Sequence, residues 1–238
     1  MKIYGLIGKN LSHSFSESYF KKKFIKKNIN NAKYINFEIN NINDIDRIIN
    51  NYNPSGLNVT IPFKEKILSK LDCLTEEAKE IGAVNTIQFK NNKLIGHNTD
   101  VLGFKNSIYP FLQKGDTALI IGDGGSSKAI KFILEKLNIN YQVVNRNSDF
   151  DYNDITNKDI INNRIIINTT PLGMYPDIND FPKIPYNSIT KNHFLFDLIY
   201  NPEETLFLKF GKNKLAKTKN GLEMLNIQAD ESWKIWNL

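Results

Sequence analysis

The sequence lacks the residues that build disulfide frameworks and metal centres. Its 238 residues contain one cysteine, Cys73, which excludes an internal disulfide and any zinc site made of paired cysteines. The three histidines, His13, His97 and His193, are scattered without the spacing of a metal motif. We therefore expect a protein that holds no metal ion and that folds without cross-links.

Long apolar runs are missing as well. No stretch approaches the roughly 18 apolar residues of a membrane-spanning helix, and residues 3–7 are too few for a signal peptide. Apolar residues nevertheless make up 41% of the chain and include 15 Phe, which excludes a disordered chain and predicts a packed core. We expect a soluble cytoplasmic protein that does not contact membranes.

Arginine is scarce, since only three of the 31 basic residues are Arg and the others are Lys. Against 25 acidic residues this gives a net charge of +6. Such a balance is compatible with an anionic partner and equally with an ordinary lysine-rich surface. The chain has no basic cluster interleaved with aromatic residues, so nucleic acid is not an expected partner.

Short apolar strands alternate with amphipathic helices along the chain. Residues 117–121 are continuously apolar, which is typical of a strand buried on both faces of a parallel sheet. The alternation predicts an α/β protein with a mostly parallel sheet, divided into two α/β domains near residues 100–103. The expected strands are 3–7, 34–39, 56–59, 84–89 and 93–95 (a hairpin across Asn91-Asn92), 117–121, 141–144, 165–168 and 194–198, and the expected helices include 16–27, 64–70, 100–112, 126–137 and 222–236.

A glycine-rich run follows the apolar strand 117–121 and precedes a helix. Gly122 would allow the tight turn, and Gly124 would let main-chain N–H groups approach a pyrophosphate. The helix that starts at Gly125 and Ser126 would direct its positive end at that anion. A plain strand-to-helix turn needs one glycine rather than three, so this run predicts a dinucleotide cofactor.

The end of the next strand narrows the choice of cofactor. Asn145 stands 23 residues after Gly122, where an acidic residue usually binds the ribose hydroxyls, and Arg146 follows it. A guanidinium binds a 2′-phosphate through two hydrogen bonds, so this pair favours NADP(H). The phosphate loop of nucleotide triphosphatases fits poorly, because Lys128 follows Ser127 rather than a glycine.

Short polar side chains precede the glycine run at several strand ends. Ser14 and Ser16 open a helix, which they could cap or at which they could bind a carboxylate. The runs 58–64, 82–86 and 96–100 each place Asn, Thr or Asp at a strand boundary. Each run alone is compatible with turn chemistry, but together they mark the edge at which open α/β sheets bind ligands.

The order and spacing of these runs resemble the shikimate dehydrogenase family, the NADP-dependent reductases of the aromatic amino-acid pathway. The resemblance extends over nearly the whole chain. It is carried by Ser14-Phe15-Ser16, Asn58-Val59-Thr60-Ile61-Pro62-Phe63-Lys64, Gly82-Ala83-Val84-Asn85-Thr86, Asn98-Thr99-Asp100, Gly122-Asp123-Gly124-Gly125, Asn145-Arg146, Asn168-Thr169-Thr170-Pro171-Leu172-Gly173-Met174, Asp197-Leu198-Ile199-Tyr200, and Asn220-Gly221-Leu222 ahead of Gln228.

The resemblance implies a role for each of these segments. Residues 1–101, with residues 220–238 packing back on them, would bind substrate, and residues 102–219 would form a Rossmann-like NADP-binding domain. Lys64 and Asp100 would be the catalytic pair. The substrate-binding residues would be Ser14, Ser16, Asn58, Thr60, Asn85, Tyr200 and Gln228, and the cofactor-binding residues would be Gly122, Asp123, Gly124, Gly125, Ser126, Asn145, Arg146, Thr169, Leu198, Gly221 and Glu76.

The implied reaction is the reversible, NADPH-dependent reduction of 3-dehydroshikimate to shikimate, and the residue types suit it. Lys64 can donate a proton to the carbonyl oxygen and stabilise the developing alkoxide. A free lysine has a pKa of about 10.4, so its exchange of protons near neutrality needs a partner, which Asp100 would supply. Taken alone, Lys64 could instead be one of the many solvated lysines.

The chain departs from the family pattern near the cofactor. Asn147–Asp151 contain acidic residues where the family has a second basic one, so we expect NADP preference with weaker discrimination against NAD. Asp123 places a carboxylate in the glycine loop, and the chain is short for the family. The alternatives are a quinate/shikimate dehydrogenase with relaxed or NAD preference, and a non-catalytic ligand-binding member. A monomer and a homodimer are both compatible with the sequence.

Overall fold

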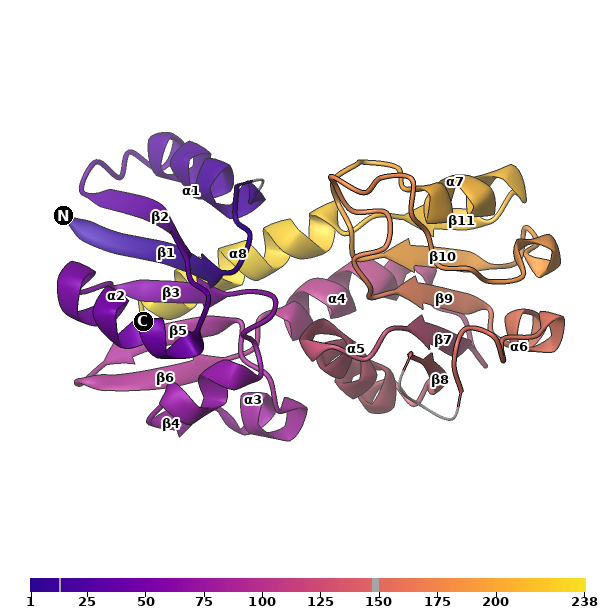
Figure 1. Cartoon of the computed structure of the whole chain (residues 1–238), viewed down its shortest axis with the longest axis horizontal. Coiled ribbons are helices and arrows are strands. Elements are labelled where there is room, and N and C mark those ends of the chain that lie inside the picture. Colours follow the sequence, from indigo (N-terminus) through magenta and orange to yellow (C-terminus); the bar gives the residue numbers. More distant parts are fainter. Residues whose placement is uncertain (13, 147–149) are drawn as a thin grey trace. The chain divides into compact units, whose positions relative to one another are not determined.

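The computed structural model describes residues 1–12, 14–146 and 150–238. These residues form two compact units, each with its own sheet (Figure 1). Unit 1 comprises Met1–Thr99 and Ala229–Leu238, and unit 2 comprises Asp100–Gln228. His13 and most of the acidic run after Arg146, namely residues 147–149, lie outside the described residues.

Unit 1 is built on a mixed six-stranded sheet of order β2-β1-β3-β5-β6-β4. β1 pairs in parallel with β2 and β3, whereas β5 pairs antiparallel with β3 and β6. The predicted hairpin joins β5 and β6 through Asn91 and Asn92, whose positive φ angles suit a tight hairpin turn. The strands are β1 (Lys2–Gly8), β2 (Ala32–Glu38), β3 (Gly56–Val59), β4 (Cys73–Leu74), β5 (Thr86–Lys90) and β6 (Lys93–His97).

The helices of unit 1 are short except for the first. The helix expected at residues 64–70 is a 3-10 helix over Lys66–Lys70, in which the Leu68 N–H donates to the Glu65 carbonyl three residues earlier. The elements are α1 (Phe15–Lys26), η1 (Ile42–Asp44), α2 (Ile45–Tyr52), η2 (Lys66–Lys70) and α3 (Glu76–Ile81).

One long helix, α8 (Leu222–Trp236), contributes residues to both units. Its residues from Ala229 onwards complete an aromatic cluster of unit 1 that includes Tyr4, Phe20 and Trp236. The Trp236 indole lies directly against Gly56 of β3, where a Cβ atom would come within 2.3 Å of the ring. Only glycine therefore permits this contact without displacing the indole.

Unit 2 holds a five-stranded, fully parallel sheet of order β11-β10-β9-β7-β8. The predicted strand 117–121 is β7, an interior strand between β9 and the edge strand β8, with its last four residues buried. The expected helix 100–112 ends at Ile108 and continues as a 3-10 turn, because Pro110 has no N–H to donate. The elements are α4 (Asp100–Ile108), η3 (Tyr109–Phe111), β7 (Thr117–Ile121), α5 (Gly125–Lys136), β8 (Asn140–Val144), α6 (Asn157–Asn162), β9 (Ile165–Asn168), η4 (Tyr186–Ser188), β10 (Phe194–Asp197), α7 (Leu206–Asn213) and β11 (Lys217–Lys219).

These two sheets confirm the predicted α/β class, with one mixed sheet and one Rossmann-like parallel sheet. Within the described part of the chain, no helix is both long enough and apolar enough to cross a lipid bilayer.

Candidate functional site

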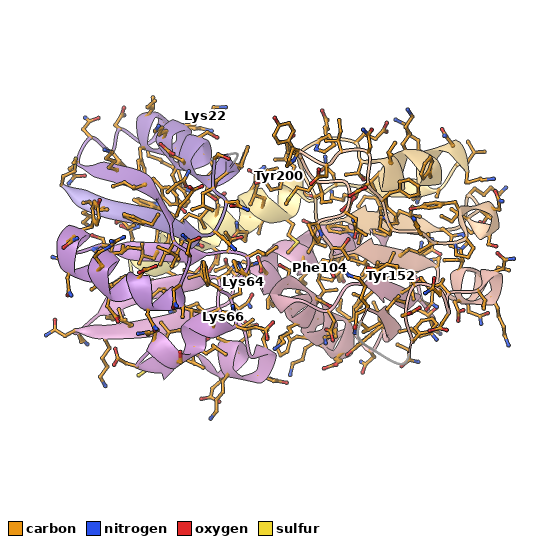
Figure 2. All side chains as sticks on the ribbon, viewed as in Figure 1. Lys22, Lys64, Lys66, Phe104, Tyr152 and Tyr200 are labelled. Carbon is orange, nitrogen blue, oxygen red and sulfur yellow. The ribbon has the colours of Figure 1, made fainter. Side chains whose placement is uncertain are left out.

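The lysine that follows β3 is buried. Lys64 keeps 9% of its surface exposed, whereas its neighbour Lys66 is exposed (Figure 2). The Lys64 carbonyl accepts a hydrogen bond from the Val84 N–H at 2.8 Å, which ties this segment to the one that leads into β5. Burying a charged ammonium costs free energy unless it is paired, and lysines are seldom buried. The burial of Lys64 therefore favours a functional lysine over a solvated one.

Asp100 is buried at the first residue of α4, where a carboxylate is favoured by the helix dipole. It belongs to unit 2, and Lys64 belongs to unit 1. The chain just before Asp100 is held by the Asn85 side chain. The Asn85 Oδ1 accepts the Thr99 N–H at 2.7 Å, and its Nδ2 donates to the Thr99 Oγ1 at 3.0 Å.

Asn58 of β3 is 5% exposed and is engaged at both ends of its amide. Its Oδ1 accepts a hydrogen bond from the Tyr34 hydroxyl at 2.9 Å. Its Nδ2 lies 2.9 Å from the Ser232 Oγ and 3.1 Å from the Thr86 Oγ1. Both ends of the Asn58 amide are therefore fixed by hydrogen bonds within unit 1.

The two serines at the start of α1 differ in what they do. Ser14 is the N-cap, since its Oγ accepts the Ser16 N–H at 3.3 Å, so one of the two possibilities left open by the sequence is observed. The Ser16 side chain donates a hydrogen bond to the Tyr34 hydroxyl, which opposes the rise in the Tyr34 pKa that burial causes. The Tyr34 hydroxyl thus contacts both Ser16 and Asn58.

The remaining residues predicted to bind substrate or cofactor from these segments are less enclosed. Thr60 follows β3 and its N–H donates to the Ile7 carbonyl at 2.9 Å. Glu76 is exposed in the first turn of α3. In unit 2, Tyr200 is half-buried beyond β10 (Figure 2), and Gln228 lies on α8 beside Gly103, one turn after Asp100 on α4.

The glycine loop has the local geometry of an anion site. Gly122 ends β7 with a φ of +103°, and a Cβ there would come within 2.7 Å of the Thr169 Oγ1. Gly124 is the N-cap of α5 and makes no side-chain capping bond, and a Cβ there would meet no atom within 4 Å. Because Gly124 has no side chain, α5 begins without the cap that a Ser, Thr, Asp or Asn at this position would supply.

Asp123 does not leave an unbalanced negative charge in this loop. Its Oδ1 lies 2.6 Å from the Nζ of Lys131, two turns along α5. The ion pair with Lys131 offsets the negative charge that Asp123 places in the glycine loop. An anion at the start of α5 is consequently compatible with the carboxylate.

Three parallel strands bring the other predicted cofactor residues to the same edge of the sheet. The Thr169 Oγ1 donates to the Ile121 carbonyl at 2.8 Å, which joins the ends of β9 and β7. Leu198 follows β10, and its N–H donates to the Asn168 carbonyl at 3.0 Å. Gly221 lies against Leu198 so closely that a Cβ would stand 2.1 Å from the Leu198 carbonyl oxygen.

Asn145 and Arg146 follow β8, the strand next to β7. Arg146 is exposed. Burial raises the pKa of the Tyr152 hydroxyl, and the charge of Arg146 opposes this rise. Tyr152 is labelled in Figure 2. The guanidinium therefore stands at the carboxyl edge of the sheet, within electrostatic reach of that ring.

Asp197, at the end of β10, has a role that sequence reasoning missed. It is fully buried, and burial raises the pKa of its carboxyl to about 7. The Thr205 hydroxyl donates to it at 2.6 Å, the Ile199 N–H at 3.0 Å and the Asn168 amide at 3.1 Å. One carboxyl group thus holds the segment that follows β9, which contains Thr169, and the segment that follows β10, which contains Leu198. The sequence signal for this role is an acidic residue that directly follows the apolar run of residues 194–196.

The pH dependence of stability tests this role. Folding raises the Asp197 pKa from 3.8 to about 7, so its protonation stabilises the fold below pH 4, and this stabilisation is lost as the pH rises through 7. Asp197→Asn should remove about 2–3 kcal/mol of the wild-type fall in unfolding free energy between pH 5 and pH 8. Urea unfolding at both pH values measures it. A variant whose stability falls as steeply as that of the wild type would contradict the assignment.

These residues fit a dinucleotide. The N-terminus of α5 has no side-chain cap, Gly124 leaves open space, and the buried Ser127 Oγ has no hydrogen-bond partner among the described residues. By contrast, the described ranges contain no group of three or more His, Cys, Asp or Glu side chains that could hold a metal ion.

Comparison with known proteins leads to one family. Residues 6–87 match a family model described as the shikimate dehydrogenase substrate binding domain. The chain is 40% identical to the shikimate dehydrogenase (NADP(+)) of Methanococcus aeolicus, over 99% of this chain and 91% of that protein.

Solved structures lead to the same family. A crystal structure of shikimate dehydrogenase 1 from Peptoclostridium difficile is 40% identical, with a TM-score of 0.89 over 100% of this chain and 92% of that one. A shikimate dehydrogenase in complex with NADP+ is 34% identical, with a TM-score of 0.86 over 99% of this chain and 90% of that one. The chain belongs to the shikimate dehydrogenase family.

Proposed function

We propose that this protein is an NADP-dependent oxidoreductase that reversibly reduces 3-dehydroshikimate to shikimate. The observation that carries the proposal is the buried Lys64 in the segment that follows β3, in a chain that is similar to NADP-dependent shikimate dehydrogenases over nearly all its length. In this proposal, residues 1–101 together with residues 220–238 form the substrate-binding domain, and residues 102–219 form the NADP-binding domain.

The substrate is held by side chains from several segments. Serine hydroxyls at the start of α1 suit a ring carboxylate, since hydroxyl and N–H groups there favour an anion. Amide and hydroxyl groups suit ring hydroxyls, because an analogue that lacks one would leave a buried polar group unpaired. The proposed set is Ser14, Ser16, Asn58, Thr60, Asn85, Tyr200 and Gln228.

The proton is moved by the lysine. In the reduction, the Lys64 ammonium donates a proton to the carbonyl oxygen and stabilises the alkoxide as it forms; in the oxidation, the amine takes the proton back. Asp100 orients the ammonium and balances its charge. When bound, NADPH supplies the hydride for the carbonyl carbon.

The cofactor is held by main-chain groups at the carboxyl edge of the parallel sheet and by one cation. The N-terminus of α5 receives the pyrophosphate, and the Arg146 guanidinium binds the 2′-phosphate. The proposed set is Gly122, Asp123, Gly124, Gly125, Ser126, Asn145, Arg146, Thr169, Leu198, Gly221 and Glu76. We retain from the sequence a monomer or homodimer that acts in the cytoplasm.

A four-way assay tests the function. Purified protein is given shikimate or quinate with NADP+ or NAD+, and kcat/KM is measured for each pair. We expect the highest value with shikimate and NADP+. A preference for quinate with NAD+ would support the alternative dehydrogenase. Ligand binding without turnover in any combination would indicate a non-catalytic member.

A further inference from the structure

The orientation of the Asn58 side-chain amide is fixed by its hydrogen-bond partners. Its Nδ2 lies 3.2 Å from the main-chain oxygen of Asn85, an atom that can only accept hydrogen bonds, so the amide nitrogen must face that oxygen. Its Oδ1 is then directed at the Tyr34 hydroxyl. The orientation of this amide is therefore determined by the groups that surround it.

Ser232 of α8 lies at the centre of that surround and is fully buried. Its Oγ is 2.9 Å from the Asn58 Nδ2, 2.8 Å from the Thr86 Oγ1 and 3.4 Å from the Thr99 Oγ1. One hydroxyl on α8 thus contacts β3, β5 and the segment that enters α4.

The same hydroxyls continue to the second asparagine. The Thr86 Oγ1 donates to the Asn85 Oδ1 at 3.2 Å, and the Thr99 N–H donates to that atom at 2.7 Å. Ser232 is consequently one hydrogen bond from Asn58 and two from Asn85. Both asparagines belong to the proposed substrate site.

On the other side of Asn58, Tyr34 is as firmly placed. It is buried, and its ring stacks on Phe20 with centroids 4.4 Å apart and an interplanar angle of 9°. Its hydroxyl meets both Asn58 and Ser16. The two ends of the Asn58 amide are therefore held by one hydroxyl from α8 and one from β2.

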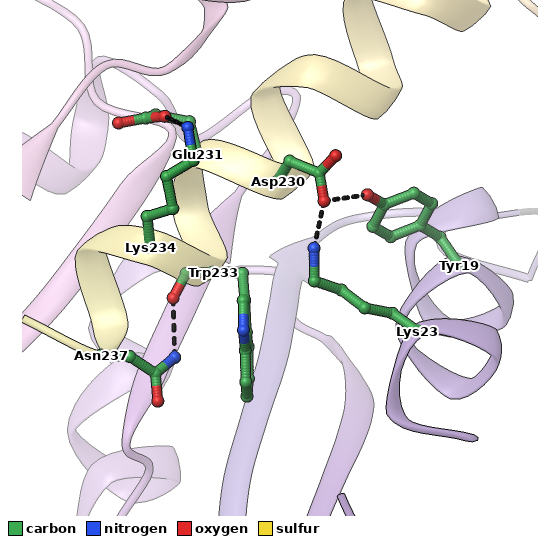
Figure 3. A network of polar contacts seen from close by, with 7 residues as sticks. All are labelled: Tyr19, Lys23, Asp230, Glu231, Trp233, Lys234 and Asn237. Carbon is green, nitrogen blue, oxygen red and sulfur yellow. Dashed lines mark hydrogen bonds and ion pairs between the residues drawn. The ribbon is translucent and has the colours of Figure 1, made fainter. Parts of the chain in front are cut away.

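The part of α8 that carries Ser232 is itself fixed within unit 1. The Asp230 carboxylate accepts a hydrogen bond from the Tyr19 hydroxyl at 2.6 Å and pairs with Lys23, both on α1 (Figure 3). One turn beyond Ser232, the Gln88 amide donates to the Ile235 carbonyl at 2.7 Å. These contacts fix the position of this part of α8 in unit 1 without using the hydrogen bonds of Ser232 itself.

We infer that Ser232 and Tyr34 are positioning residues that hold Asn58, and through Thr86 and Thr99 also Asn85, in the geometry required for substrate binding. The inference rests on the proposed function and deepens it. It gives the end of α8 a part in substrate recognition that needs no contact between Ser232 and the substrate.

Ser232→Ala tests the inference because it removes the hydroxyl and little volume. We expect the KM for shikimate to rise about tenfold, since a buried amide and a threonine each lose a partner, while the KM for NADP+ stays within twofold. Tyr34→Phe, which keeps the stacked ring, should act in the same direction, and the double variant should fall short of the product of the two effects. Tyr34→Phe also carries the test if Ser232→Ala does not fold.

Ser107→Ala is the matched control, because Ser107 is a buried serine on α4 whose Oγ has no hydrogen-bond partner among the described residues. It should leave both KM values unchanged. A thermal-shift readout with shikimate and with NADP+ gives the same comparison without turnover. Unchanged shikimate binding in Ser232→Ala and Tyr34→Phe, or an equal loss for both ligands, would overturn the inference alone. A wild type that turns over no shikimate would overturn the proposed function and this inference with it.

Discussion

Replacing Lys64 by methionine should lower kcat for shikimate oxidation about 10³-fold, the usual contribution of a positioned acid–base group. Methionine keeps an unbranched stem of similar length, and the site is buried, so the folded protein should tolerate the change. The variant loses the group that takes the hydroxyl proton, and with it the charge that stabilises the alkoxide. Steady-state kinetics with saturating NADP+, together with shikimate binding measured by calorimetry, separate the loss of chemistry from a loss of affinity.

Lys66 provides the control for this experiment. It lies two residues later and is exposed, so Lys66→Met removes the same charge from the same segment at the surface. We expect turnover within twofold of the wild type. If Lys64→Met retained wild-type kcat, Lys64 would not be the proton donor, whatever the fate of the rest of the site.

Gly122→Ala should raise the KM for NADP+ roughly 30- to 100-fold, equal to about 2–3 kcal/mol of lost binding. Gly122 has a φ of +103°, which an L-residue adopts only with strain, and the new Cβ would meet the Thr169 Oγ1 at 2.7 Å and the Thr170 Cγ2 at 2.8 Å. The Thr169 hydroxyl is committed to the Ile121 carbonyl, so the loop must move instead. Isothermal titration with NADP+ measures the effect, and shikimate binding should persist.

Gly115→Ala separates backbone strain from the effect on the cofactor. Gly115 has a φ of +83° in the turn before β7, and a Cβ there would meet no atom within 4 Å. This variant should lose about 1 kcal/mol of stability and bind NADP+ normally. Equal NADP+ affinity in Gly122→Ala and the wild type would show that the glycine loop does not hold the cofactor.

The features that the sequence predicts well are those with local causes. The glycine loop after β7 follows from an apolar run and the residues that end it, and the β5–β6 hairpin follows from Asn91 and Asn92. The site residues in unit 1 are predicted by the resemblance between ordered motifs, whereas the periodicity of the sequence does not identify them. Their chemical types then explained why such a chain could reduce a ketone.

The features that escaped prediction depend on distant partners. Ser232 is an unremarkable serine in a helix until α8 is packed over Asn58, which lies 174 positions earlier. Asp197 is an acid at a strand end until burial and its three donors distinguish it. The short edge strands β4 and β11 are strands only through their pairing with β6 and β10. The contacts of Ser232 and of the two edge strands leave no pattern within a window of neighbouring residues, and Asp197 is visible there only as an acid that ends an apolar run.

The division of α8 between the units has a consequence for biosynthesis. Residues 229–238 supply the Trp236 indole that lies against Gly56 and the Ser232 hydroxyl that contacts Asn58, so unit 1 lacks part of its core until the ribosome has translated them. Unit 2 is contiguous, and all its residues have been synthesised by then. The unit whose synthesis starts first therefore cannot complete its aromatic cluster until the last of its own residues has been made.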